Sequence, residues 1–132
     1  MLKAQSPLLD DDEKLIHNTI GCCIAVHREL GPGLSEKVYL RTVCLELAAA
    51  GIGYEREKRF DIVYREHVIG VLRVDLIVGG IVVLELKSIE QLLRLHHRQL
   101  LNYMRVAGKR VGLLLNFNVA VLPDGMVRKV LS

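Results

Sequence analysis

The sequence predicts an α+β domain in which helices flank a mixed central β-sheet. Two segments with apolar residues at helical spacing come first, and three strand-like segments follow them. Another helical segment and two further strands complete the order ααβββαββ. With 132 residues, 51% of them hydrophobic, the chain has enough apolar material for one core and is not a disordered sequence. We expect a single domain over 1–132, with 1–9 as a flexible N-terminal segment.

The first helix is predicted over 10–30, because an acidic triplet at 10–12 supplies an N-cap and a negatively charged first turn. "LGPGL" (30–34) ends it, and Ser35 caps a second helix that runs to residue 50. Strands are then expected over 54–64, 68–78 and 81–87, a third helix over 92–107, and final strands over 110–117 and 126–131.

The stretch "RVDLIVGGIVVLELKS" (73–88) contains the clearest pattern. Its even-numbered positions from 74 to 86 are apolar outside the glycine turn, so the alternation predicts one core face and one charged face. The charged residues at odd positions are Arg73, Asp75, Glu85 and Lys87. A two-residue glycine turn would mix the two faces, so we expect a three-residue loop, 79–81, that sets Asp75 opposite Glu85.

Two carboxylates opposed in this way lie about 5 Å apart at Cβ and repel each other. A divalent cation such as Mg²⁺ or Mn²⁺ would turn that repulsion into a binding site, because these ions prefer oxygen ligands. Lys87 lies two residues after Glu85, on the same face, where it can orient an attacking water or stabilise charge on a phosphate. The alternative is a surface ladder in which Lys87 and Arg73 only pair with the acids.

The charges and cysteines indicate a partner and a compartment. Residues 91–132 carry seven Lys/Arg against one Asp/Glu, which favours a polyanion such as nucleic acid, although an ordinary solvated surface explains the same count. The three cysteines, Cys22, Cys23 and Cys44, match no zinc or disulfide spacing. No apolar run reaches the ~18 residues of a spanning helix, and the first residues lack the apolar core of a secretory signal. We expect a cytoplasmic protein with reduced thiols and no membrane partner.

Asp75, followed ten residues later by Glu85-Leu86-Lys87, resembles the active-site signature of the PD-(D/E)XK nuclease superfamily. "GLSEKVY" (33–39) is similar to the pattern that names the GxxExxY protein family. The segments "RVDL", "LELKS", "HHRQLLNY" and "GLLLNFN" follow in that family's order and spacing, so the resemblance covers nearly the whole chain. It implies a restriction-endonuclease-like α/β core.

The resemblance also implies roles for individual residues. The metal would be held by Asp75, Glu85, the backbone carbonyl of Leu86 and the helix acid Glu36, and Lys87 would be the catalytic lysine. Mg²⁺, or Mn²⁺, would be the cofactor. From the residues alone, Glu36 is better explained as an acid in the first turn of a helix, where the helix dipole stabilises it.

Gln99 and Tyr103 resemble the Q-x-x-x-Y element of exonuclease-like branches of the superfamily. They are four residues apart and share a helix face, where they can bind a phosphate or stack on a base. The alternative is that Tyr103 packs and Gln99 bonds the backbone. His96, Arg98 and Arg73 complete the expected nucleic-acid contacts.

We therefore predict a Mg²⁺-dependent nuclease, an endonuclease or an exonuclease, that hydrolyses phosphodiester bonds of nucleic acid, with DNA as the expected substrate. The alternative is a catalytically silent nuclease-fold module that binds nucleic acid or a protein partner. A homodimer is a further expectation, because so small a domain offers limited contact area for a duplex. The sequence leaves the choice between DNA and RNA open.

Overall fold

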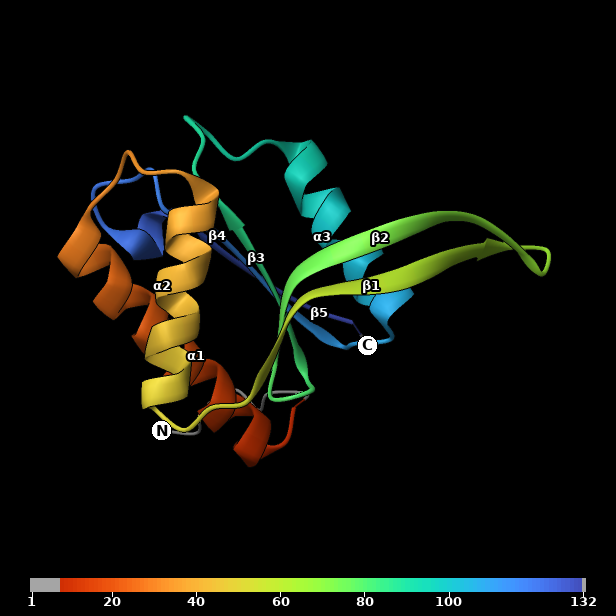
Figure 1. Ribbon diagram of the computed structural model, residues 1–132, viewed down its shortest axis with the longest axis horizontal. Coiled ribbons are helices and arrows are strands. Elements are labelled where there is room, and N and C mark those ends of the chain that lie inside the picture. Colours follow the sequence, from red (N-terminus) through yellow and green to blue (C-terminus); the bar gives the residue numbers. More distant parts are fainter. Residues whose placement is uncertain (1–7, 132) are drawn as a thin grey trace, which may run out of the picture.

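The computed structural model describes residues 8–131 and contains every element that the sequence predicts (Figure 1). In chain order these are α1 (Asp10–Leu30), α2 (Glu36–Ala49), β1 (Tyr54–Tyr64), β2 (His67–Val78), β3 (Val82–Lys87), α3 (Arg94–Ala107), β4 (Val111–Asn116), the 3-10 helix η1 (Leu122–Gly125) and β5 (Met126–Val130). The α+β class and the order ααβββαββ are confirmed. Of the N-terminal segment expected to be flexible, residues 1–7 lie outside the described part, and Leu8 is buried against the core.

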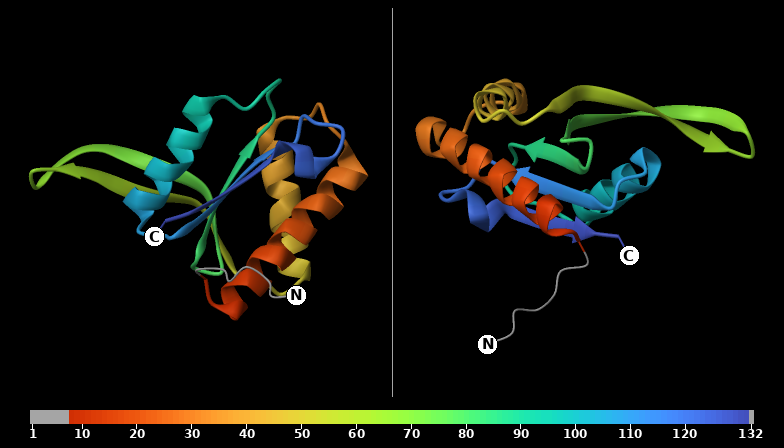
Figure 2. Two further views of the ribbon diagram at one scale, coloured as in Figure 1. Left: turned by 180° about the vertical axis from the view of Figure 1, so that it is seen from behind. Right: turned by 90° about the horizontal axis from the view of Figure 1, so that it is seen from below.

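The strands form one five-stranded sheet in the order β1-β2-β3-β4-β5. Neighbouring strands are antiparallel except for β3 and β4, which are parallel. Helix α3 makes the crossover between these two strands that a parallel pair requires. Helices α1 and α2 pack on one face of the sheet and α3 on the other (Figure 2), so the sheet is the middle of three layers.

Both faces of the central strands are therefore apolar, and the prediction of one core face and one charged face holds only in part. Leu84 and Leu113 pack in the cluster beneath α1 and α2, whereas Val83 and Leu114 pack in the cluster beneath α3. The charged residues of β3 share the α3 side with these apolar neighbours. The acids predicted to lie on a charged surface thus lie at the margin of a second core.

Strand β2 changes face at a bend. The β1–β2 ladder pairs Arg56 with Leu76 and Lys58 with Val74 but has no pair between them, where Glu57 has a φ of 52°. Val74 was expected to share the face of Leu76, and this is wrong: Val74 packs in the α3-side cluster and Leu76 in the other. Beyond the bend the two strands leave the sheet as a two-stranded ribbon (Figure 1).

The predicted three-residue loop between β2 and β3 is confirmed. Val78 pairs with Val82, which leaves residues 79–81 as the connection. Gly79 and Gly80 have φ values of 59° and 70°, in the left-handed region that glycine adopts without strain. A Cβ on Gly79 would also lie 2.6 Å from the side chain of Leu15.

The helix ends follow the sequence signals with one exception. The N-cap of α1 is Leu9, which makes no side-chain cap, so the expected aspartate cap is wrong. The four acidic residues 10–13 form the first turn instead, where the helix dipole stabilises their negative charges. The Ser35 side chain accepts a hydrogen bond from Val38 N at 3.4 Å and caps α2 as predicted. Gly108 ends α3 in the left-handed conformation.

The three cysteines belong to the core beneath α1 and α2. All three are buried and free, and burial raises the pKa of each thiol. Among the helices of residues 8–131, none combines the length and the apolar character needed to cross a membrane.

Candidate active site

Asp75 and Glu85 meet where the β2–β3 ladder stops. The last paired residues are Leu76 and Leu84. One position further, Glu85 Oε1 accepts a hydrogen bond from Asp75 N at 2.9 Å, and Asp75 Oδ2 accepts one from Leu86 N at 2.9 Å. Each carboxylate therefore accepts a hydrogen bond from a backbone amide of the opposite strand. These two bonds replace the backbone hydrogen bonds that would continue the β2–β3 pairing. The opposition of the two acids follows from the three-residue loop.

Burial makes this carboxylate pair electrostatically unfavourable. Glu85 is only 6% exposed, and its loss of water, followed by the nearby charge of Asp75, raises the pKa of Glu85 to about 9. Burial also raises the pKa of Asp75, and the charge of Glu36 adds to that rise. The positive charge of Lys87 acts in the opposite direction on the pKa of both acids. At neutral pH the metal-free pair is expected to retain a proton.

The four expected metal ligands are only partly brought together. Asp75 and Glu85 are adjacent, with the backbone of Leu86 beside them. Glu36, the first residue of α2, is exposed, and its charge reaches Asp75 from a distance. Within residues 8–131, no three His, Cys, Asp or Glu side chains converge closely enough to hold a metal ion by themselves.

Helix α3 contributes the opposite wall of the site. A small hollow of about 10 Å³ separates it from β3, which is room for about one water molecule. Its polar lining consists of Glu85, Lys87, His96, Gln99 and Tyr103. Burial, followed by the charges of the two acids, raises the pKa of Tyr103. Both residues of the Q-x-x-x-Y element thus face the carboxylate pair.

The other expected nucleic-acid contacts occupy different places. His96 lines the hollow, but its Nδ1 accepts a hydrogen bond from Leu93 N at 2.8 Å, so this ring also caps the start of α3. Arg98 is exposed on α3, outside the lining of the hollow. Arg73 is exposed on β2 directly opposite Arg59 and is not among the charges that shift the pKa of Asp75.

Tyr39, the last residue of the "GLSEKVY" segment, organises the loop before α2. Its hydroxyl donates to Gly31 O at 2.5 Å and accepts from Leu34 N at 3.1 Å. Its ring is fully buried and stacks on Phe117 with centroids 4.5 Å apart. The tyrosine therefore shapes the connection between α1 and α2 from inside the core.

Ser88 ties this loop to the end of β3. Its hydroxyl donates to Leu34 O at 2.6 Å, and it directly follows Lys87 in the chain. This bond holds the start of α2 beside the strand that carries Glu85, which brings Glu36 within electrostatic range of Asp75. No local sequence signal reveals this role of Ser88, because the bond links segments far apart in the chain.

Asn116 fixes the segment that leaves β3. The side chain is 2% exposed; its Oδ1 accepts from Ile89 N at 3.1 Å, and its Nδ2 donates to Ile89 O at 2.9 Å. The same Oδ1 accepts from Asn118 N at 3.2 Å. Next to it, Phe117 N donates to Lys87 O at 2.8 Å. The position of Lys87 thus depends on β4, which no local sequence signal reveals.

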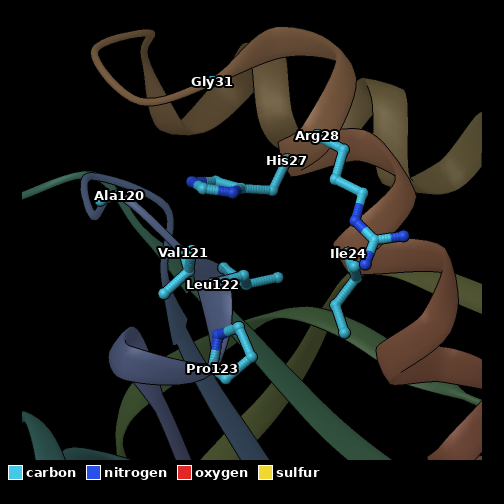
Figure 3. Close-up of a pocket in the computed structure, with 8 residues that line it drawn as sticks. All are labelled: Ile24, His27, Arg28, Gly31, Ala120, Val121, Leu122 and Pro123. Carbon is cyan, nitrogen blue, oxygen red and sulfur yellow. The ribbon is translucent and has the colours of Figure 1, made fainter.

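A larger hollow of about 390 Å³ lies elsewhere, between the end of α1 and η1 (Figure 3). His27 projects across it, and the Arg28 side chain, which also lines it, extends toward Ile24. His27 is 5% exposed, and its Nε2 lies 3.1 Å from Phe117 O and 2.9 Å from Val119 O. Since carbonyl oxygens only accept, Nε2 carries a hydrogen, and the ring braces α1 against the segment after β4. Among residues 8–131, no carboxylate lines this hollow.

The comparison with known families agrees with this geometry. The sequence profile of the PD-(D/E)XK nuclease superfamily matches residues 13–130, a range that includes every residue of the site described above. No curated protein and no solved structure gives a significant match. The likeness to GxxExxY proteins rests on the sequence motifs alone. The chain belongs to the PD-(D/E)XK nuclease superfamily.

Proposed function

We propose that this protein is a nuclease that hydrolyses phosphodiester bonds of nucleic acid, with Mg²⁺ or Mn²⁺ bound at Asp75 and Glu85 and with DNA as the substrate. The observation that carries the proposal is the pairing of the buried carboxylate of Glu85 with the half-buried carboxylate of Asp75, beside Lys87. Membership of a nuclease superfamily supports the reaction class.

The donor chemistry of the site fits a hard divalent cation. Two carboxylates with raised pKa values lie side by side, and a positive ion would stabilise the ionised form of both. Asp75, Glu85 and the carbonyl of Leu86 would hold it, and water would complete its shell, since no third carboxylate converges with them in the described chain. A bound divalent cation polarises the scissile phosphate and lowers the pKa of a bound water.

The chain's own side chains supply the remaining parts of the reaction. Lys87 provides positive charge next to the acids, where it would stabilise the negative charge that builds on the phosphate. Gln99 and Tyr103 face the same hollow and would hydrogen-bond the phosphate or the attacking water. The exposed basic residues of α3, Arg94, Arg98 and Arg105, would attract the nucleic-acid backbone.

A substrate panel tests the proposal. Single-stranded, duplex and branched DNA and RNA are incubated with Mg²⁺, Mn²⁺ or EDTA, and cleavage is read on denaturing gels. We expect metal-dependent cleavage that Lys87→Ala and Asp75→Ala abolish. Lys14→Ala, at an exposed position of α1, is the matched control and should retain full activity. Wild-type cleavage by a folded Lys87→Ala protein would contradict the assigned chemistry.

A catalytically silent module is the second candidate, and the lack of a converging third acid within residues 8–131 favours it. Such a module would bind nucleic acid or a protein partner without cutting. Calorimetric titration with Mn²⁺ separates the two cases. No metal binding, together with DNA retention that EDTA leaves unchanged, supports the silent module; metal binding at Asp75 and Glu85 supports the nuclease.

The setting that we propose is the cytoplasm. The three buried free thiols support it, because that compartment keeps cysteines reduced. Cell fractionation of the tagged chain measures its location.

A further inference from the structure

Two arginines face each other across the two-stranded ribbon that β1 and β2 form beyond the bend. Arg59 and Arg73 are directly opposed in the antiparallel ladder, and both side chains are exposed. Opposed residues have Cβ atoms about 5 Å apart, so the two guanidinium groups repel each other. Within residues 8–131 neither arginine forms an ion pair, whereas Lys58 in the same ribbon pairs with Glu55 at 2.6 Å. The arginine pair therefore carries two positive charges that no acid of the described chain compensates.

The arginine pair points away from helix α3. The next pair of the ladder, Phe60 with Leu72, packs against the cluster beneath α3. Since successive residues of a strand point to opposite faces, Arg59 and Arg73 lie on the face of the ribbon that α3 does not cover. In the right view of Figure 2, α3 lies on one side of the ribbon and no helix lies on the other. The two guanidinium groups are thus open to a ligand from solvent.

Positive charge is concentrated where the ribbon leaves the sheet. Residues 56–60 and 71–74, which we call the base of the ribbon, contain four Lys/Arg against one Glu. The outer residues, 61–70, contain one Arg against one Asp and one Glu. A uniformly solvated hairpin would not divide its charges in this way. The base of the ribbon attracts an anion, and the outer part does not.

The base of the ribbon also lies next to the carboxylate pair of the site. Arg73 precedes Asp75 by two residues, which correspond to about 7 Å of extended chain. Neither arginine is among the charges that shift the pKa of Asp75 or of Glu85. The positive charge of the arginines therefore does not serve the two acids and is available to a ligand that reaches past them.

We propose that Arg59 and Arg73 together hold a backbone phosphate of the nucleic acid that binds at the carboxylate pair. This inference rests on the proposed function, because it takes nucleic acid as the ligand of the site. A phosphate between two guanidinium groups removes their repulsion and accepts hydrogen bonds from both. A duplex strand carries one charge per about 3.4 Å of its axis, so a strand with one phosphate at Asp75 has another near the arginine pair about two nucleotides away. Because the contact is to the backbone, it positions the strand and reads no base.

The salt dependence of stability tests the repulsion between the two arginines. Arg59→Gln/Arg73→Gln keeps two polar side chains and removes both charges. Added NaCl screens like charges, so it should raise the melting temperature of the wild type more than that of this double variant. Circular dichroism at low salt shows whether the variant is folded. An equal response of the two folded proteins to salt overturns the repulsion on which the proposal depends.

Fluorescence anisotropy with a labelled DNA duplex, its single strand and the RNA of the same sequence tests the contact in EDTA, where metal-dependent cleavage cannot occur. Loss of one phosphate contact should weaken duplex binding by about tenfold at about 50 mM salt, and should reduce the slope of log Kd against log salt by about 0.9, or about 0.7 for a single strand. Lys14→Gln/Arg28→Gln removes two exposed cations of α1 and is the matched control, which should keep the wild-type slope. A double ribbon variant with the affinity and slope of the wild type overturns the proposal, as does a wild type that binds none of these nucleic acids.

Cleavage kinetics separate this contact from the nuclease reaction. The double ribbon variant should raise KM for DNA by about tenfold and keep kcat, because the arginines bind the strand away from the carboxylate pair. Cleavage by a folded variant with the wild-type KM overturns the phosphate contact and leaves the nuclease proposal standing. A protein that never cleaves, but whose DNA affinity falls with the arginine pair, keeps the phosphate contact and contradicts the nuclease.

Discussion

Replacing Glu85 by glutamine tests whether the buried acids destabilise the metal-free protein. Glutamine keeps the size of the side chain and an oxygen that can accept from Asp75 N, but it cannot ionise. In the folded protein the pKa of Glu85 rises from 4.5 to about 9, mainly because the carboxyl group is buried. A raised pKa means that ionisation favours unfolding, so the stability contributed by the neutral acid is complete below pH 4.5 and is lost as the pH rises toward 9.

The size of the effect follows from that shift. Each pH unit between the two pKa values changes the free energy of unfolding by about 1.4 kcal/mol, so the wild type should lose about 3 kcal/mol between pH 5 and pH 7 through this residue. Glu85→Gln has no such loss. The two proteins should therefore be similar in stability near pH 5 and differ by about 3 kcal/mol at pH 7, about 10 °C in melting temperature for a domain of this size.

Urea and thermal unfolding of both proteins in EDTA at pH 5, 6, 7 and 8 provide the measurement. Carboxylates other than Asp75 titrate alike in the two proteins, so the difference between the two curves reports the ionisation of Glu85 together with its coupling to Asp75. Glu90→Gln, at an exposed position after β3, serves as the control and should follow the wild type. A difference that stays constant with pH, or a wild type more stable than Glu85→Gln at pH 7, would refute the reasoning. Mg²⁺ bound at the site would narrow the gap by stabilising the wild type.

Three further substitutions probe the framework of the site. Tyr39→Phe removes the hydroxyl that bonds both Gly31 and Leu34, and should lower the free energy of unfolding measured in urea by about 1–2 kcal/mol. An unchanged free energy of unfolding would show that this hydroxyl does not stabilise the loop before α2. Gly112→Ala puts a Cβ 2.5 Å from the Sδ of Met104 and should lower the free energy of unfolding by about 1–3 kcal/mol. Its control, Gly21→Ala, lies in open space on α1 and should raise the free energy of unfolding by about 0.5–1 kcal/mol. Equal effects of the two substitutions would contradict the close approach of α3 to the sheet. Asn116→Ala should expose the amide of Ile89, and hydrogen exchange at that amide should accelerate; unchanged protection there would exclude the proposed clamp.

The sequence predicted what depends on local alternation and turn chemistry. The meeting of Asp75 and Glu85 followed from the parity of the two strands and the length of the loop between them, which are properties of a short stretch of chain. The face shared by Gln99 and Tyr103 followed from helical spacing in the same way. Helix ends were located because Ser35 and Gly108 have distinct backbone preferences.

The sequence did not predict what depends on contacts between distant segments. Glu57 adopts a positive φ at the bend, and a glutamate in the sequence gives no sign of this conformation. Because β2 changes face there, Val74 packs beneath α3 and not on the face that was expected. The same bend lies between Arg73 and Asp75, two residues that strict alternation put on one face. Ser88 and Asn116 are ordinary polar residues in the sequence, and only the folded chain gives them partners.

The parallel pair at the centre of the sheet sets the order in which the chain can fold. β2 and β3 are joined by a short loop and can form a hairpin within microseconds, while β3 and β4 can pair only after α3 has crossed between them. We therefore expect Asp75 and Glu85 to come together early, while water still surrounds them, and to be dehydrated late, when α3 and β4 pack against β3. Interactions formed after the transition state act mainly on the unfolding rate. Raising the pH should thus shorten the lifetime of the metal-free native state while leaving the refolding rate nearly constant.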